Sequence, residues 1–353
     1  MLLPATASTV WILAIVSLLC LGSWAATLKM AGKWRFEFFY FDFVSGILLS
    51  AIAAAFVLGS SHPQELTFQD NMTLAGYRKM AWALGSGVVL NLGLLLLLAA
   101  MTVSGLSVAF PLALGVGLVI GTTWDALSAT PSSWVLVAGG IVLFLAAVVS
   151  IALAHSWRLD SQRLAAQTPL RPDPRVKSAR PKQPGAALAI ALAFVSGIAL
   201  SIFPRVLSQA TSGENGLAPY SVVLLLSISA LLSSPFFVLF FITFPITADA
   251  AAGGNYLSGN VKQHLLGIAG GLLWTAGTLC ALLAAGAPSA AQPNPLIQYA
   301  LSHAALLVAA AWGLLAWNEF RGANDRIRMM VTGSLVLFLS GLGLMAFAAS
   351  AAK

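Results

Sequence analysis

Residues 80–125 read MAWALGSGVVLNLGLLLLLAAMTVSGLSVAFPLALGVGLVIGTTWD, and no charged side chain occurs in this stretch before its last residue. As a helix, about 20 apolar residues span the roughly 30 Å hydrocarbon layer of a membrane. The stretch is long enough for two such spans, near 80–101 and 104–125, with only Thr102 and Val103 between them. It therefore predicts two consecutive transmembrane helices with a very short connection.

Similar apolar runs cover most of the chain. Of the 353 residues, 59% are hydrophobic and 8% are charged, and the mean hydropathy is +0.90. Soluble domains carry about a quarter charged residues, so this composition excludes a soluble fold. We predict an all-α polytopic membrane protein with about ten transmembrane helices. Besides the two spans above, the expected spans lie near 9–29, 40–60, 133–155, 186–209, 219–243, 264–286, 295–317 and 329–350.

One long polar connection divides these spans into two sets of five. Residues 156–184 contain five prolines and seven basic residues, with little that could form a core. This composition predicts a basic, proline-rich, flexible linker. The expected domains are a first five-helix repeat at 1–155 and a second at 185–353. Because five is odd, two homologous halves would have inverted orientations, which is a recurring plan in transporters.

The lysines and arginines predict the orientation in the membrane. Fourteen of the 18 lie in loops on the same side as the linker, and four lie on the opposite side. Cytoplasmic loops carry the excess of basic residues, so we expect a cytoplasmic linker and both termini outside, in the inner (plasma) membrane of the cell. The basic residues are not interleaved with aromatic ones, so the expected partner is the lipid bilayer and no nucleic acid.

Polar or aromatic side chains deep inside apolar spans are candidate substrate ligands, because burying them in hydrocarbon is expensive unless they serve a purpose. Asn91 lies about 18 Å into its span at 1.5 Å per residue. Its amide can bind a polar substrate or hydrogen-bond to another helix. His303 can bind substrate, carry a coupled proton, or donate to a backbone carbonyl. Gln298 and Ser302 share a helix face near it. Trp274 can stack on a planar ligand or serve packing alone.

Asp42 and Glu319 lie at predicted cytoplasmic span ends and are candidates for gating or for proton coupling. Either carboxylate can instead be a solvated group at a helix end. As gating residues they would form salt bridges that break when the inner side opens. The cations available for such bridges are Lys29, Arg35 and Arg321.

Three further residues are expected near span ends. Arg205 follows Pro204, which interrupts the helical hydrogen-bond ladder near the outer end of its span. Its guanidinium can bind an anionic substrate, pair with Asp125, or extend to the membrane interface, and it is a further candidate for coupling or gating. Trp24 and Trp124 are expected to be interface anchors, because tryptophan is enriched where hydrocarbon meets water.

Several motifs are together similar to a known family. They are LGSWAATLK at 21–29, YFDFVSG at 40–46, GLSVAFP at 105–111, VIGTTW at 119–124, LAPY at 217–220 and WGLLAWNEFR at 312–321. Their order and spacing resemble the ureide permeases, near the glucose/ribose and rhamnose porters of the drug/metabolite transporter superfamily. The resemblance implies ten helices in two inverted five-helix repeats, and uptake of small polar molecules, often with protons. Residues 156–184 lack the phosphate-binding G-x-x-x-x-G-K-S/T loop, so no nucleotide dependence is expected.

We predict a secondary transporter, not an enzyme, that imports a small neutral polar metabolite such as a ureide or nucleobase, coupled to protons or else to sodium. A sugar carrier of the glucose or rhamnose type is the main alternative, because the same hydrogen-bonding and aromatic groups would serve it. A drug exporter would carry a deep carboxylate, and a scaffold or sensor would need a larger loop, so both rank lower. No catalytic motif is present, and neither a cofactor nor a metal is expected.

Overall fold

The computed structural model of the chain describes residues 3–61, 66–128, 133–167, 185–246, 255–292, 301 and 303–350. Within these ranges every regular element is helical. In chain order the elements are α1 (Ala7–Ser23), α2 (Ala26–Met30), α3 (Phe36–Val57), α4 (Phe68–Ser104), α5 (Leu106–Ser128), α6 (Trp134–Gln167), α7 (Ala186–Thr211), α8 (Pro219–Thr243), the 3-10 turn η1 (Tyr256–Ser258), α10 (Val261–Ala285), α12 (Ala305–Ala311), the π-helical turn η2 (Trp312–Ala316) and α13 (Asp325–Ser350).

Eight of the described helices are long and apolar enough to cross a membrane. The α1 helix and the α12–η2 segment are shorter apolar helices. The prediction of an all-α polytopic membrane protein is therefore confirmed. Part of the predicted span 295–317 lies outside the described residues.

The predicted span 9–29 is not one continuous helix, because Trp24 and Ala25 separate α1 from α2. At this break the Thr27 hydroxyl donates to the carbonyl of Trp24 at 2.7 Å, which replaces part of the lost helical bonding. The two short helices allow the chain to change direction inside the bundle.

Trp24 points into the core at this break. Its indole stacks on Phe43 with ring centroids 4.7 Å apart and lies near Phe110, and the residue is 2% exposed. The prediction that Trp24 anchors the protein at the membrane interface is therefore wrong, because the break between helices turns the ring inward. Trp124, in contrast, is 59% exposed.

The α6 helix continues beyond its predicted end at residue 155 and reaches residue 167. Residues 156–167 contain neither proline nor glycine, so nothing in the sequence stops the helix there. The extension also contacts α13, since the Arg326 guanidinium lies 4.4 Å from the Trp157 ring centroid. The prediction that the flexible linker begins at residue 156 is therefore wrong for these first residues.

Helices from the two halves of the chain pack in a reciprocal pattern. In chain order, α1, α3, α4, α5 and α6 of the first half correspond to α7, α8, α10, α12 and α13 of the second. Exchanging corresponding helices turns the packed pair α4–α7 into the packed pair α1–α10, and the pair α3–α10 into the pair α4–α8. The same holds for α5–α7 and α1–α12, while α3–α8 and α6–α13 map onto themselves. Two related halves of inverted orientation would produce this pattern.

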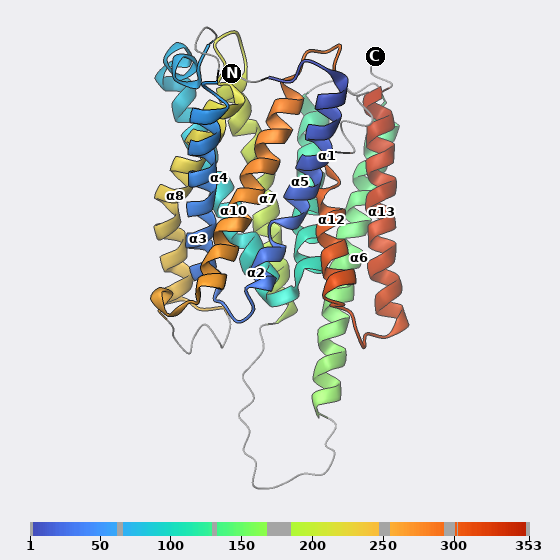
Figure 1. The fold of residues 1–353 in the computed structure, drawn as a ribbon. Coiled ribbons are helices and arrows are strands. Elements are labelled where there is room, and N and C mark those ends of the chain that lie inside the picture. Colours follow the sequence, from blue (N-terminus) through green and yellow to red (C-terminus); the bar gives the residue numbers. More distant parts are fainter. Residues whose placement is uncertain are drawn as a thin grey trace.

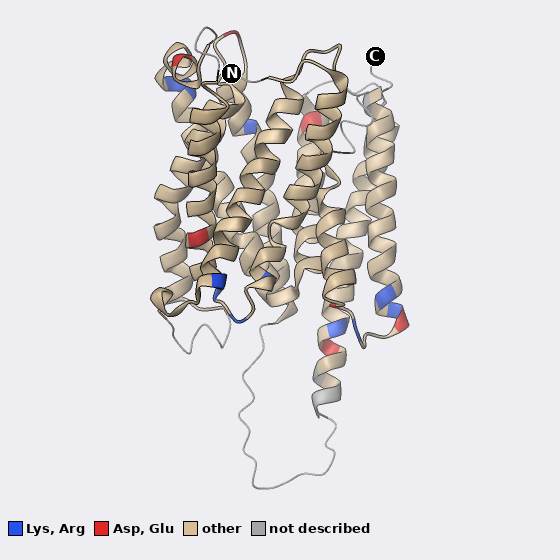
Figure 2. Cartoon of the chain, viewed as in Figure 1, with Lys and Arg blue, Asp and Glu red and all other residues tan. Residues whose placement is uncertain are grey.

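The two ends of the bundle differ. The start of α1 and the end of α13 lie at one end, which we call the terminal end (Figure 1). The α6 helix protrudes from the opposite end, which we call the linker end (Figure 1). Charged side chains gather mainly at these two ends, with long uncharged lengths of helix between them (Figure 2).

Candidate functional site

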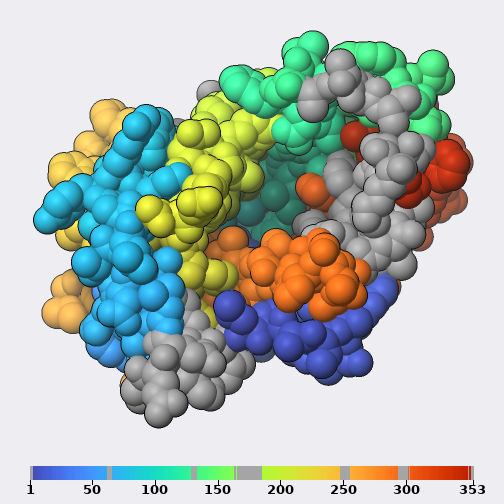
Figure 3. Space-filling view, turned by 90° about the horizontal axis from the view of Figure 1, so that it is seen from above, coloured from blue at the N-terminus to red at the C-terminus, as the bar shows by residue number. Residues whose placement is uncertain are grey.

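A recess opens at the terminal end of the bundle. Figure 3, which looks onto this end, shows the recess between α7, α10 and α6, with part of α5 at its floor. Along α5, residues 106–113 are all buried, whereas several side chains between Leu114 and Asp125 are partly or fully exposed. At 1.5 Å per residue the exposed part of α5 is about 17 Å long, so it extends toward the middle of a membrane.

Arg205 and Asp125 form an ion pair near the mouth of this recess, with Nη2 and Oδ1 2.6 Å apart. The guanidinium also donates to the carbonyls of Ser201 at 2.7 Å and Gly121 at 2.6 Å, and lies 5.5 Å from the Trp124 ring centroid. Of the alternatives for Arg205, the structure shows the pair with Asp125. The mouth therefore presents a neutralised pair, which contributes little stability because Asp125 is exposed.

Asn91 lies in α4 and has no exposed surface. Its side-chain oxygen accepts hydrogen bonds from the Tyr40 hydroxyl at 2.6 Å and from the Ser234 hydroxyl at 3.2 Å. Its amide nitrogen donates to the Ser233 hydroxyl at 2.8 Å. These bonds connect α3 and α4 of the first half to α8 of the second, so the structure shows the helix-to-helix bonding that was one of the two alternatives for Asn91.

We expect Asn91→Ala to lower the free energy of unfolding by about 1–2 kcal/mol, because side-chain hydrogen bonds between membrane helices contribute up to roughly this amount. Unfolding in detergent measures the change. Ser50→Ala is the matched control, since the Ser50 hydroxyl bonds only to carbonyls of its own helix. Unchanged stability together with lost substrate binding would instead make Asn91 a substrate ligand.

Of the other four predicted substrate ligands, the structure describes Trp274 and His303. Trp274 lies in α10, is 5% exposed and belongs to the main hydrophobic core. His303 is half-buried just before α12. Gln298 and Ser302 lie outside the described residues.

Glu319 lies at the linker end, in the turn between η2 and α13, with a side chain that is 6% exposed. Its carboxylate pairs with the Lys29 ammonium of α2 and accepts the backbone N–H groups of Leu106 at 2.9 Å and Ser107 at 2.8 Å. The Ser107 hydroxyl donates to it as well. The positive N-terminal end of α5 favours a carboxylate at this position. We call these four residues the Glu319 network. Of the three cations that the sequence offers, the structure selects Lys29.

The surroundings of Glu319 keep its carboxylate ionised. Burial alone would raise the pKa of Glu319, but the hydrogen bonds from Lys29 and Ser107 and the charge of Lys29 outweigh burial and lower the pKa. The carboxylate therefore stays ionised at neutral pH. Because the folded-state pKa is lowered, the stability that Glu319 contributes is present above its ordinary pKa and is lost only as pH falls through the lowered value.

Two glycines make room for the Glu319 carboxylate. Gly105 has a φ of +88°, and a Cβ there would lie 2.9 Å from the carboxyl atoms. A Cβ on Gly313 would lie 2.6 Å from Oε2 of Glu319 and 2.7 Å from the backbone nitrogen of Ser107. Larger residues at either position would displace the carboxylate from the start of α5.

Asp42 forms a second polar network near the linker end. The residue lies in α3 and is 4% exposed. Its carboxylate lies 2.9 Å from Nδ1 of His264 in α10 and accepts the hydroxyl of Tyr256 in η1. Burial, and next the hydrogen bond to Asp42, raise the pKa of Tyr256 to about 12. The phenol therefore stays protonated and donates a hydrogen bond to the Asp42 carboxylate. We call these three residues the Asp42 network.

The predicted salt bridge between Asp42 and a lysine or arginine is wrong. Arg35 pairs instead with Glu37 at 3.2 Å on the first turn of α3. Asp42 lies further along the helix, where α10 and η1 supply its partners. No sequence motif marks His264 or Tyr256 as a partner of Asp42. The position of His264 at the start of the predicted span 264–286 is the one signal that could have marked it.

No protein-family model matches this chain. Ureide permease 1 of Arabidopsis thaliana is 23% identical in a match that covers 92% of this chain and 93% of that protein. Ureide permease 3 of Arabidopsis thaliana is 30% identical over 112 residues, and this match covers 31% of the chain and 32% of that protein. Over nearly its whole length, therefore, the chain is similar at low identity to a plant permease.

Proposed function

We propose that this protein is a secondary transporter that imports a small neutral polar metabolite, such as a ureide or a nucleobase, by alternating access. The observation that carries the proposal is the contrast between the two ends of the bundle. The terminal end is hollowed, whereas the Glu319 and Asp42 networks join the two halves at the linker end. A solute would enter the recess from the terminal end, while the two networks hold the halves together at the linker end. The similarity to ureide permeases supports this class of solute.

The reciprocal helix contacts support two inverted repeats, at 1–155 and 185–353. In such transporters one half rocks against the other around a central site. Breaking the Glu319 and Asp42 networks would open the linker end as the recess closes. With the linker in the cytoplasm of the cell and both termini outside, the recess faces outward and accepts solute for import.

The charges around the recess favour a neutral solute. The exposed part of α5 carries no charged side chain before Asp125, and Asp125 is paired with Arg205. A charged solute would need a counter-charge deep in the recess, because an unpaired charge in hydrocarbon is expensive.

The proposed ligands are those that can stack on a planar solute or hydrogen-bond to it. They are Trp274 and His303, together with Gln298 and Ser302. Asn91 is not included, because its amide is already bonded to α3 and α8. Small rotations of α10 and α12 during closure would bring Trp274 into contact with the solute.

We assign proton coupling to Asp42. A carboxylate inside a membrane span marks a functional site by default, and proton relay is one of the roles it can serve; the titratable groups that contact Asp42 are Tyr256 and His264. The Arg35–Glu37 pair lies at the start of the same helix. Protonation of Asp42 would remove the charge that holds His264, weaken the contact between α3 and α10, and favour opening of the linker end. Glu319 and Arg205 are each held in ion pairs and are assigned to gating.

A thermal-shift titration with allantoin as the ureide, uracil as the nucleobase and glucose tests the substrate class. Saturable stabilisation by allantoin or uracil is expected, about 2.7 kcal/mol at a hundred times the Kd. It should be lost in Trp274→Ala and His303→Ala and kept in Trp134→Ala, a control for an exposed tryptophan. Stabilisation by glucose alone would favour the sugar carrier, and no stabilisation by any of the three would count against the proposal.

A further inference from the structure

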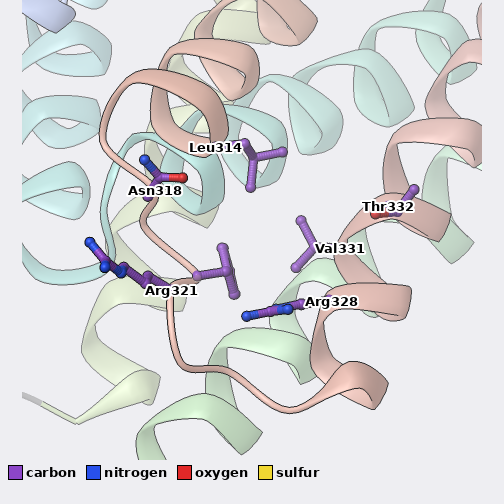
Figure 4. Close-up of a pocket in the computed structure, with 7 residues that line it drawn as sticks. Leu314, Asn318, Arg321, Arg328, Val331 and Thr332 are labelled. Atoms are coloured by element: carbon purple, nitrogen blue, oxygen red, sulfur yellow. The ribbon is translucent and has the colours of Figure 1, made fainter.

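We propose that the linker end carries a binding site for the phosphate-bearing headgroup of an anionic phospholipid, in a pocket between η2 and α13. The pocket has a volume of ≈ 500 Å³ (Figure 4). It combines an apolar floor with a polar rim, which is the combination that a lipid requires. The floor consists of Leu314, Phe320 and Val331, and the rim of Asn318, Arg321, Arg328 and Thr332.

The two arginines of the rim are available to an anion. Both are exposed, and neither forms an ion pair or a side-chain hydrogen bond within the described part of the chain. Arg35 at the same end, in contrast, is paired with Glu37. In Figure 4, Arg328 reaches from α13 across the pocket, and Arg321 lies on the opposite side, near Asn318. An anionic headgroup at the pocket would therefore meet positive charge from both sides.

Exposed apolar side chains next to the pocket offer a surface for an acyl chain. The α12 helix packs against α5 and α1, and α13 packs against α6. Leu315 and Met329, which follow the lining residues Leu314 and Arg328 in the chain, are 78% and 71% exposed. A hydrocarbon chain would cover this apolar surface, which a soluble phosphate would leave in contact with water.

Further arginines lie near the pocket. At the linker end of α6 and at the start of α13, basic side chains lie next to acidic ones (Figure 2). Two of these arginines are held on aromatic rings, Arg158 at 4.8 Å from the Phe320 centroid and Arg326 at 4.4 Å from that of Trp157. Basic residues next to a membrane attract anionic lipids, by about fivefold in affinity for each residue.

Native mass spectrometry of the purified protein in a neutral detergent tests the site. Phosphatidylglycerol should bind at least about tenfold more tightly than phosphatidylcholine, as two arginines contribute about fivefold each. An equal concentration of inorganic phosphate should not displace it. Arg321→Gln and Arg328→Gln should each weaken phosphatidylglycerol binding about fivefold. Arg78→Gln, which removes an exposed arginine near the start of α4, should leave it unchanged.

Three results would overturn the inference. Equal binding of the two lipids would remove the role of charge, and displacement of the lipid by phosphate would make the pocket a site for a soluble anion. A double variant of Arg321 and Arg328 that binds phosphatidylglycerol like the wild type would place the lipid elsewhere. The experiment measures lipid binding in the absence of substrate, so its outcome does not depend on the proposed transport function.

Discussion

Glu319→Gln is expected to reduce the initial rate of substrate uptake at least about tenfold. The substitution leaves the Lys29 ammonium without its counter-charge and weakens the bonds to the start of α5. Breaking a buried ion pair costs about 3–5 kcal/mol, and we expect about 2 kcal/mol because the Lys29 side chain is 30% exposed. This energy changes the ratio of closed to open linker ends about thirtyfold. Uptake into proteoliposomes measures the effect.

Asp325→Asn is the matched control for Glu319→Gln. It removes an exposed carboxylate at the start of α13 that forms no ion pair within the described residues, so uptake should stay within about twofold, as for most surface substitutions. Equal uptake by Glu319→Gln and the wild type would show that the Glu319 network does not close the linker end.

Exchanging the two charges gives a sharper test of the same network. A simple ion pair would be restored by combining Lys29→Glu with Glu319→Lys. The Glu319 network should not be restored, because the N–H groups of Leu106 and Ser107 would then face an ammonium that can accept no hydrogen bond. Recovery of uptake in the double variant would contradict the role assigned to the start of α5.

Asp42→Asn is expected to abolish accumulation driven by a pH gradient while substrate exchange continues. With one proton per substrate, a gradient of one pH unit supplies about 1.4 kcal/mol and supports about tenfold accumulation in the wild type. Asparagine cannot take up the proton, so accumulation should fall to the level without a gradient. Counterflow of labelled substrate, which needs no gradient, should continue.

Glu214→Gln serves as the control for Asp42→Asn, because it removes an exposed carboxylate in the turn between α7 and α8 that forms no ion pair within the described residues. It should keep the response to the pH gradient. If Asp42→Asn still accumulates substrate about tenfold at one pH unit, the proton is carried by another group, and His303 is the next candidate.

The membrane spans could be predicted from the sequence because the information is local. An apolar run of sufficient length forms a transmembrane helix almost regardless of its neighbours. The break at Trp24 could not be predicted in this way, because it depends on stacking of the indole against Phe43 and Phe110 on other helices. The extension of α6 beyond residue 155, in contrast, was open to prediction, because residues 156–167 contain neither proline nor glycine.

The sequence singles out polar residues within the membrane spans but not the partners that the structure gives them. Asn91, Asp42 and Glu319 stand out because polar groups are rare in hydrocarbon. Their partners come from distant parts of the chain, and two of them are backbone N–H groups that no sequence pattern displays. The sequence therefore offers several cations for Glu319 and cannot choose among them. It also cannot show that Tyr40 and Ser233 already occupy the amide of Asn91.

Uptake of labelled allantoin and uracil by proteoliposomes that contain the purified wild-type chain tests the central claim most directly. The account predicts saturable uptake of at least one of them, above that of liposomes without protein and inhibited by an excess of the same unlabelled compound. Uptake of neither compound by folded protein, in the presence or absence of a pH gradient, would contradict the assignment of this chain as a transporter of small neutral polar metabolites.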